Sequence, residues 1–287
     1  MSRQSIRNIT EAVFDGLSNL ESLFLWDNQI TILPEGIFHG LFNLRHLSLG
    51  SNQLTSMPEA IFDGLLGLEV LSFSGNNLKS LPEGIFHGLL SLRELNLNSD
   101  KLTTLPAGIF QGLTGLKYLS LDNNELTSIP EGIFKGLTAL YWIYFSNNRL
   151  KELPAGVFRD LSALEELDLT GHELTSLEEG VFTGLSKLRG LHLGYNKIAR
   201  LDKGVFHGLS GLSWLDLGGN QLTGFPKGIF DRTTQLLGLD LGGNQLTSLP
   251  EGLFDGLSTI GWLYLQDNRL VCVSSMAFAN LTALTVL

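Results

Sequence analysis

Residues 239–257 read LDLGGNQLTSLPEGLFDGL, and close variants of this stretch recur along the whole chain. The step between copies is 24 residues, without an insertion or deletion. The first residue of each LxLxxN segment falls at Leu23, Leu47, Leu71, Leu95, Leu119, Ile143, Leu167, Leu191, Leu215, Leu239 and Leu263. A fixed period of this length is typical of a solenoid, in which each repeat buries its apolar side by stacking on its neighbours.

Each column of the repeat has a physical role. The alternating LxL predicts a short strand with two apolar side chains inward and the x residue outward, and stacked strands form a parallel sheet. An Asn follows the strand, where its amide can both donate to and accept from the backbone groups of a tight turn. This Asn ladder comprises Asn28, Asn52, Asn76, Asn124, Asn148, Asn196, Asn220, Asn244 and Asn268.

The return segment of the repeat is marked by Phe and Pro. A Phe recurs every 24 residues from Phe14 to Phe278 and predicts a stacked apolar spine near the convex wall. All eight Pro share one column, which Glu178 and Asp202 fill in two repeats. We therefore expect one solenoid domain over residues 1–287, with a parallel β-sheet on the concave face and short 3-10 or irregular segments on the convex face.

The motifs LPEGIF, LPAGIF and LPEGLF, followed by xGLxxL and LxLxxNxL, resemble the extracellular 24-residue leucine-rich repeats. The resemblance is greatest to the variable lymphocyte receptors of jawless vertebrates and to similar receptors of lower chordates. It implies a horseshoe-shaped solenoid whose concave sheet binds antigen, helped by a loop in a cysteine-rich cap. This chain departs from that pattern, since it has no Cys clusters and its only Cys is Cys272.

The composition of the chain indicates which kinds of partner and which location to expect. The net charge is −10 and no basic cluster occurs, which argues against nucleic acid and anionic membranes as partners. No apolar run reaches the roughly 18 residues of a membrane span. The first ten residues, MSRQSIRNIT, lack the apolar region of a signal peptide, so we expect none in this sequence, although a signal removed earlier is compatible with it. The resemblance and two glycosylation sequons, at Asn8 and Asn280, favour an extracellular location.

The ends of the chain fall inside repeats. Met1 lies one repeat before Leu25, and Leu287 is the next term of the strand series. Exposed apolar core and unpaired strand edges at such ends predict end-to-end self-association. Cys272 stands where other repeats carry Ser or Thr, so we expect a small half-buried residue; the alternative is a thiol left without a cap partner.

The information for binding lies in the outward strand positions, because packing fixes the other columns. Large aromatic residues there gain no core burial, and they are typical of interface hot spots, although strand propensity alone also favours them. All four Trp of the chain lie at these positions. The aromatic candidates for ligand binding are Trp26, Tyr118, Trp142, Tyr144, Trp214, Trp262 and Tyr264.

A second candidate feature is a row of polar residues in the middle column, formed by Asp168, His192, Asp216 and Asp240. Neighbouring rungs lie roughly 5 Å apart, so these charges repel one another unless a cation joins them. Protonation of His192 would partly neutralise the row. Alternatively, the row is a subsite for Lys or Arg of a protein ligand or for an amino sugar. No tight ligand geometry favours a metal, so we expect no metal and no cofactor.

Two positions interrupt the Asn ladder. Asp100 and His172 stand where nine other repeats have Asn. An ionised Asp cannot donate, and burial disfavours its charge, so Asp100 should either bind a proton or leave a carbonyl unpaired. We interpret both residues as tolerated defects; the alternative is that these positions are reshaped for a ligand at the turn edge. The Glu residues after Pro, such as Glu83, we interpret as a solvated stripe.

The sequence can be compared with three classes of function. The first is a recognition module, an immune-receptor ectodomain that binds a protein or a microbial surface glycan, including bacterial surfaces, on its concave face. The second is an extracellular adhesive or matrix protein that uses the same sheet. The third, an enzyme, is rejected, because no nucleophile is paired with a base and a hydrolase built on Asp216 and Asp240 would need a pocket.

Overall fold

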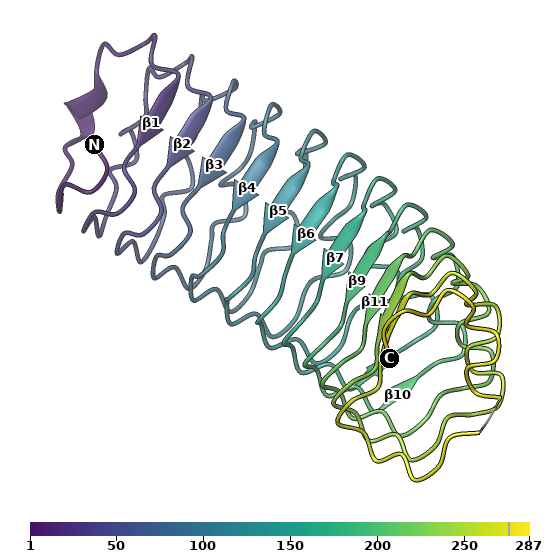
Figure 1. Ribbon diagram of the computed structural model, residues 1–287. Coiled ribbons are helices and arrows are strands. Elements are labelled where there is room, and N and C mark those ends of the chain that lie inside the picture. Colours follow the sequence, from purple (N-terminus) through teal and green to yellow (C-terminus); the bar gives the residue numbers. More distant parts are fainter. Residues whose placement is uncertain (275) are drawn as a thin grey trace. The chain divides into compact units, whose positions relative to one another are not determined.

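The computed structural model describes residues 1–274 and 276–287. The chain divides into two compact units, Met1–Tyr144 and Phe145–Leu287. Each unit is a stack of similar turns with a parallel sheet along one side, as the predicted leucine-rich repeat solenoid requires (Figure 1). One domain over residues 1–287 remains a prediction.

The sheet of the first unit has six parallel strands. They are β1 (Ser22–Phe24), β2 (His46–Ser48), β3 (Val70–Ser72), β4 (Glu94–Asn96), β5 (Tyr118–Ser120) and β6 (Trp142–Tyr144). Each pairs with the next in the 24-residue register of the sequence, as Leu23 does with Leu47. One 3-10 helix, η1 (Glu11–Phe14), precedes β1, and the remaining return segments are turns and bends.

The second unit repeats this arrangement and adds a small sheet. Its main strands are β7 (Glu166–Asp168), β9 (Gly190–His192), β11 (Trp214–Asp216), β12 (Gly238–Asp240) and β13 (Trp262–Tyr264). They are parallel and paired in that order. The two-stranded sheet consists of β8 (Ser176–Leu177) and β10 (Arg200–Leu201).

The small sheet forms where the Pro column is interrupted. The backbone N–H of Asp202 donates to the carbonyl of Leu177 at 3.1 Å. A Pro at position 202 would have no N–H for this bond, so the consensus residue would end the ladder there. The positions of Glu178 and Asp202 in the Pro column did not by themselves predict the second sheet.

The Asn ladder forms as predicted. Asn124 is representative: its Oδ1 accepts from the N–H of Leu102 at 3.1 Å. Its Nδ2 donates to the carbonyls of Leu97 at 2.9 Å and Leu121 at 3.0 Å. One side chain therefore ties three backbone groups from successive rungs, and it is only 6% exposed.

Asp100 supplies the hydrogen-bond acceptor of a ladder Asn but not its donor. Its Oδ1 accepts from the N–H of Leu78 at 3.1 Å. Its Oδ2 is buried and has no hydrogen-bond partner within the described parts of the chain. Burial raises the pKa of Asp100 to about 7, against the lowering effect of the Leu78 and Asn76 backbone N–H groups. The predicted cost of an acceptor-only residue in the ladder is therefore present at this rung.

His172 supplies both a hydrogen-bond acceptor and a donor in place of a ladder Asn. Its Nδ1 accepts from the N–H of Leu150 at 3.3 Å, so Nε2 carries the proton and donates to the carbonyl of Phe145 at 2.8 Å. The ring also packs edge to face on Phe145, with centroids 5.5 Å apart. Burial lowers the pKa of His172 to about 4 and keeps it neutral, although the Phe145 carbonyl and the charge of Asp168 act in the other direction.

The Phe spine lies opposite the strands. Phe38 and Phe62, for example, stack with ring centroids 6.2 Å apart and an interplanar angle of 11°. The spine Phe residues from Phe14 to Phe254 are buried. Full burial of one such ring contributes about 1.5–3 kcal/mol, so the spine is a large part of the core.

Cys272 corrects one expectation. It is exposed rather than half-buried. The reason is local: residues 271–274 are all exposed, and the neighbouring Val271 is 88% exposed. Substitution of the usual Ser or Thr by Cys at this position therefore adds nothing to the core.

Candidate functional site

The candidate site lies on what we call the strand face, formed by the outward side chains of the strands. In most strands the middle residue is buried and its two neighbours are half-buried or exposed, as the alternating LxL predicted.

The first unit carries an aromatic cluster of Tyr118, Trp142 and Tyr144. Trp142 meets Tyr118 edge to face, with ring centroids 5.3 Å apart, and meets Tyr144 in the same manner at 6.2 Å. Tyr144 is 43% exposed, and the other two rings are half-buried. Tyr141, which the sequence analysis did not include, also contacts Trp142, at 5.6 Å. The cluster therefore places two half-buried rings and one exposed ring in mutual contact on the neighbouring strands β5 and β6.

Trp26 stands apart from this cluster and is covered from within the chain. The guanidinium of Arg3 lies over the Trp26 ring at 4.7 Å from its centroid. The same guanidinium pairs with Asp27 at 3.4 Å between Nε and Oδ2. Trp26 therefore already holds a cation, a contact that spacing alone did not reveal.

The second unit carries the acidic row, formed by Asp168, His192, Asp216 and Asp240. The strand register places His192 between Asp168 and Asp216, and Asp216 directly beside Asp240, as predicted. Burial raises the pKa of Asp216, and the neighbouring charge of Asp240 adds to this, whereas the Gly218 N–H and His192 lower it. The neighbouring carboxylates of the row therefore repel one another at neutral pH.

Each Asp of the row is held by the turn that follows it. Oδ1 of Asp216 accepts from the N–H of Gly218, and Oδ1 of Asp240 accepts from the N–H of Gly242, both at 2.8 Å. Asp168 makes the same bond to Thr170 at 2.9 Å. These bonds turn the three carboxylates toward the segment that follows each strand.

His192 has a partner that the sequence analysis missed. Its Nε2 lies 3.5 Å from Oε2 of Glu166. The Glu166 carboxylate lies over Gly190, where any side chain would displace it. The signal available in the sequence was the alternation of Glu, Gly, Trp, Gly and Trp in the first outward column of these strands.

The aromatic residues of the second unit flank the row. The Trp214 ring lies across Gly238 on the next strand. Trp262 is 42% exposed, and Tyr264 is paired in register with Asp240. The outward positions of β11, β12 and β13 therefore carry two acidic and three aromatic side chains.

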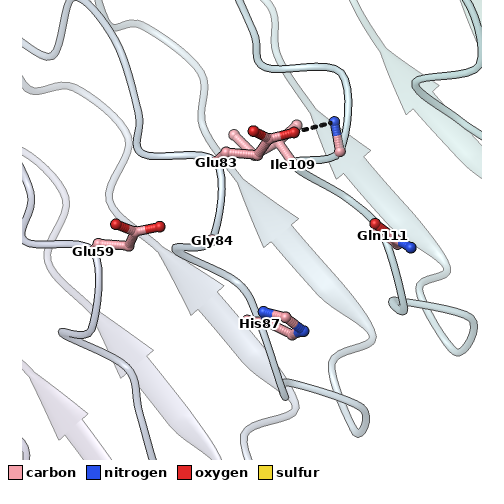
Figure 2. Close-up of a pocket in the computed structure, with 7 residues that line it drawn as sticks. Glu59, Glu83, Gly84, His87, Ile109 and Gln111 are labelled. Atoms are coloured by element: carbon pink, nitrogen blue, oxygen red, sulfur yellow. Dashed lines mark hydrogen bonds between the residues drawn. The ribbon is translucent and has the colours of Figure 1, made fainter.

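A hollow away from the strand face is lined by Glu59, Glu83, His87 and Gln111, among others (Figure 2). Oε1 of Glu83 accepts from the backbone N–H of Gly108 in the next repeat, at 3.2 Å. This bond makes Glu83 a link between repeats in addition to a member of the solvated stripe. Within residues 1–274 and 276–287, no group of three or more His, Cys, Asp or Glu is placed to hold a metal ion.

The two sequon residues lie on the surface. Asn8 is exposed, and so is Asn280, whose Nδ2 donates to Oδ1 of Asp255 at 2.8 Å. Glycosylation at either residue remains a prediction. None of the helices in the described part of the chain is long and apolar enough to cross a membrane.

A stack of repeats whose strand face carries half-buried and exposed aromatic and acidic side chains is an architecture typical of proteins that bind other molecules across an extended surface. The leucine-rich repeat model matches residues 1–54, 42–102, 91–149, 114–174, 163–222, 212–270 and 234–287. The chain belongs to the leucine-rich repeat family. No curated protein matches the sequence.

Three solved structures are similar over most of the chain. The Toll–Spatzle complex, described as a hub in Drosophila development and innate immunity, matches 97% of this chain and 37% of its own at 31% identity and a TM-score of 0.86. The TLR13–ssRNA13 complex matches 91% and 42% at 26% identity and a TM-score of 0.70. FLRT2, in an octameric complex with Latrophilin 3 and Unc5D, matches 82% and 71% at 26% identity and a TM-score of 0.69. The chain thus spans about two fifths of the first two.

Proposed function

We propose that this chain is the recognition segment of an extracellular receptor and that it binds a protein ligand on its strand face. The observation that carries this proposal is the aromatic cluster of Tyr118, Trp142 and Tyr144, because large aromatic side chains that gain no core burial are typical of interface hot spots. An immune role, of the kind found in variable lymphocyte receptors, is the form we favour.

The similar structures support this direction. Toll is complexed with the protein Spatzle, and FLRT2 with Latrophilin 3 and Unc5D. The TLR13 complex contains single-stranded RNA, so the bound molecule is not a protein in every similar structure. For this chain the net charge of −10 favours protein over nucleic acid, because phosphates would be repelled. The FLRT2 likeness also favours the second candidate function, adhesion through the same face.

The test is a screen of the purified chain against arrays of secreted and cell-surface ectodomains, with a glycan array in parallel. The double variant Trp142→Ser/Tyr144→Ser should weaken capture of the protein ligand at least tenfold. Phe42→Ser is the matched control, because Phe42 is an aromatic residue outside the strands and 62% exposed. It should bind as the wild type does. Equal binding by the double variant, with an unchanged circular dichroism spectrum, or binding to glycans alone, would refute the proposal.

A further inference from the structure

The placement of Trp214 depends on the absence of a side chain at Gly238. A Cβ atom built at Gly238 collides with the Trp214 six-membered ring, so the indole lies against the backbone of the next strand. Gly238 and Asp240 point to the same face of β12, two residues apart. The indole therefore lies over the first outward position of β12, two residues before Asp240, and Asp216 stands two residues after Trp214 on its own strand. We call Trp214, Asp216 and Asp240 the Trp214 site.

The surroundings of the Trp214 site carry negative charge that is not matched on this face. The outward residues of β7, β9, β11, β12 and β13 include Glu166, Asp168, Asp216 and Asp240 but no Lys or Arg. His192 lies against Glu166. Adjacent carboxylates roughly 5 Å apart repel each other, and a bound cation would remove this repulsion. The charge of the face therefore complements a basic ligand.

The chain itself shows which cation fits such a site. At the start of the first unit, the guanidinium of Arg3 lies over the Trp26 indole and pairs with the carboxylate of Asp27. Indole and carboxylate thus hold one arginine side chain on the surface of a repeat. The Trp214 site has the same two components, with two carboxylates in place of one.

We propose that the Trp214 site binds an arginine side chain of an extended, basic segment of the protein ligand. The guanidinium stacks on the indole while its N–H groups donate to the carboxylates of Asp216 and Asp240. Arginine suits this arrangement better than lysine, because a planar guanidinium stacks on aromatic rings and donates in a fork to carboxylates. The inference rests on the proposed function, but it concerns residues other than the aromatic cluster.

The experiment is an NMR titration of the chain with the peptide Gly-Arg-Gly-Arg-Gly, following the four indole N–H signals. The Trp214 signal should shift and saturate, and the Trp142 signal should stay in place. The same peptide with citrulline, a neutral isostere of arginine, should leave the Trp214 signal unmoved. A lysine peptide should bind at least threefold more weakly than the arginine peptide.

Variants separate the site from general attraction to an acidic chain. Asp216→Asn/Asp240→Asn should weaken the titration at least tenfold. Gly238→Ala, which displaces the indole without changing charge, should weaken it at least fivefold and serves if the double variant does not fold. The matched control, Asp63→Asn/Asp231→Asn, removes the same charge at exposed positions after the spine Phe and should change affinity less than twofold.

Several results would overturn the inference: an equal shift with citrulline, equal or tighter binding of the lysine peptide, or an equal loss with the control pair. An unmoved Trp214 signal at saturating peptide would do the same. None of these results bears on the aromatic cluster, whose test uses the ectodomain arrays. A failure here is thus distinguishable from a failure of the proposed function.

Discussion

Replacing Asp100 by Asn should stabilise the first unit, and the gain should grow with pH. In the wild type, Oδ2 of Asp100 is buried and has no hydrogen-bond partner among residues 1–274 and 276–287. An Asn at this position would place an N–H₂ group toward the carbonyls of Phe73 and Leu97, which already accept from Asn76 and Asn124 in the neighbouring rungs. The substitution completes the ladder and removes a buried charge.

The size of the effect follows from the pKa of Asp100, which is 3.8 for the free residue and about 7 in the fold. Because burial raises the pKa, the folded chain binds the proton more tightly than the unfolded chain. The native state is therefore favoured fully below pH 4, and this advantage is lost as the pH rises through 7. At about 1.4 kcal/mol per pKa unit, Asp100 costs about 4 kcal/mol of stability at pH 8 relative to pH 4.

The assay is thermal and urea unfolding of the wild type and Asp100→Asn at pH 5 and pH 8, followed by circular dichroism. The variant should gain about 1.5 kcal/mol at pH 5 and about 4 kcal/mol at pH 8, because the loss in the wild type begins above the free pKa of 3.8. Asp63→Asn, at an exposed position, controls for the change in net charge. An equal gain at both pH values would show that Asp100 is ionised throughout, and a loss of stability would show that the ladder assignment at this rung is wrong.

Three further predictions concern the ladder and the last repeat. His172→Asn should remove a loss of stability that the wild type undergoes in acid. Because burial lowers the pKa of His172 from 6.5 to about 4, its stabilising effect is full above pH 6.5 and falls by about 3 kcal/mol toward pH 4. Unfolding of both proteins at pH 4.5 and pH 7 would reveal the difference. Asn124→Ala should cost about 3 kcal/mol in urea unfolding, because it leaves the N–H of Leu102 and two carbonyls without their partner; a cost below 1 kcal/mol would contradict the ladder's role. Val286 and Leu287 are 38% and 65% exposed, so the 1–287 polypeptide should self-associate with rising concentration in sedimentation, and Val286→Glu/Leu287→Glu should suppress this.

The sequence predicted the parts of the fold that obey its period. Strands, Asn ladder and Phe spine all recur every 24 residues, and each column has one packing role that every copy repeats. The period also placed Asp216 beside Asp240, because in-register pairing follows from equal repeat lengths. The sequence did not predict the small sheet of β8 and β10, because this sheet depends on which carbonyl group the backbone N–H of Asp202 reaches.

The site was predicted by position but not by contact. The outward columns identified Trp214 and the acidic row, yet not that the indole lies across Gly238 or that Glu166 turns toward His192. These contacts depend on side-chain rotamers, which spacing does not determine. Arg3 was missed for the same reason: it lies far from Trp26 in sequence, and nothing in the repeat assigns it a role.

The small sheet bears on how the second unit folds. In a solenoid each repeat is stabilised mainly by its neighbours, so folding can start at any pair and spread. The repeats that contain β8 and β10 are joined by a second set of backbone hydrogen bonds in addition to the pairing of β7, β9 and β11. These local contacts close early at little cost in chain entropy, which makes this pair of repeats the place where we expect the folding nucleus of the second unit to form.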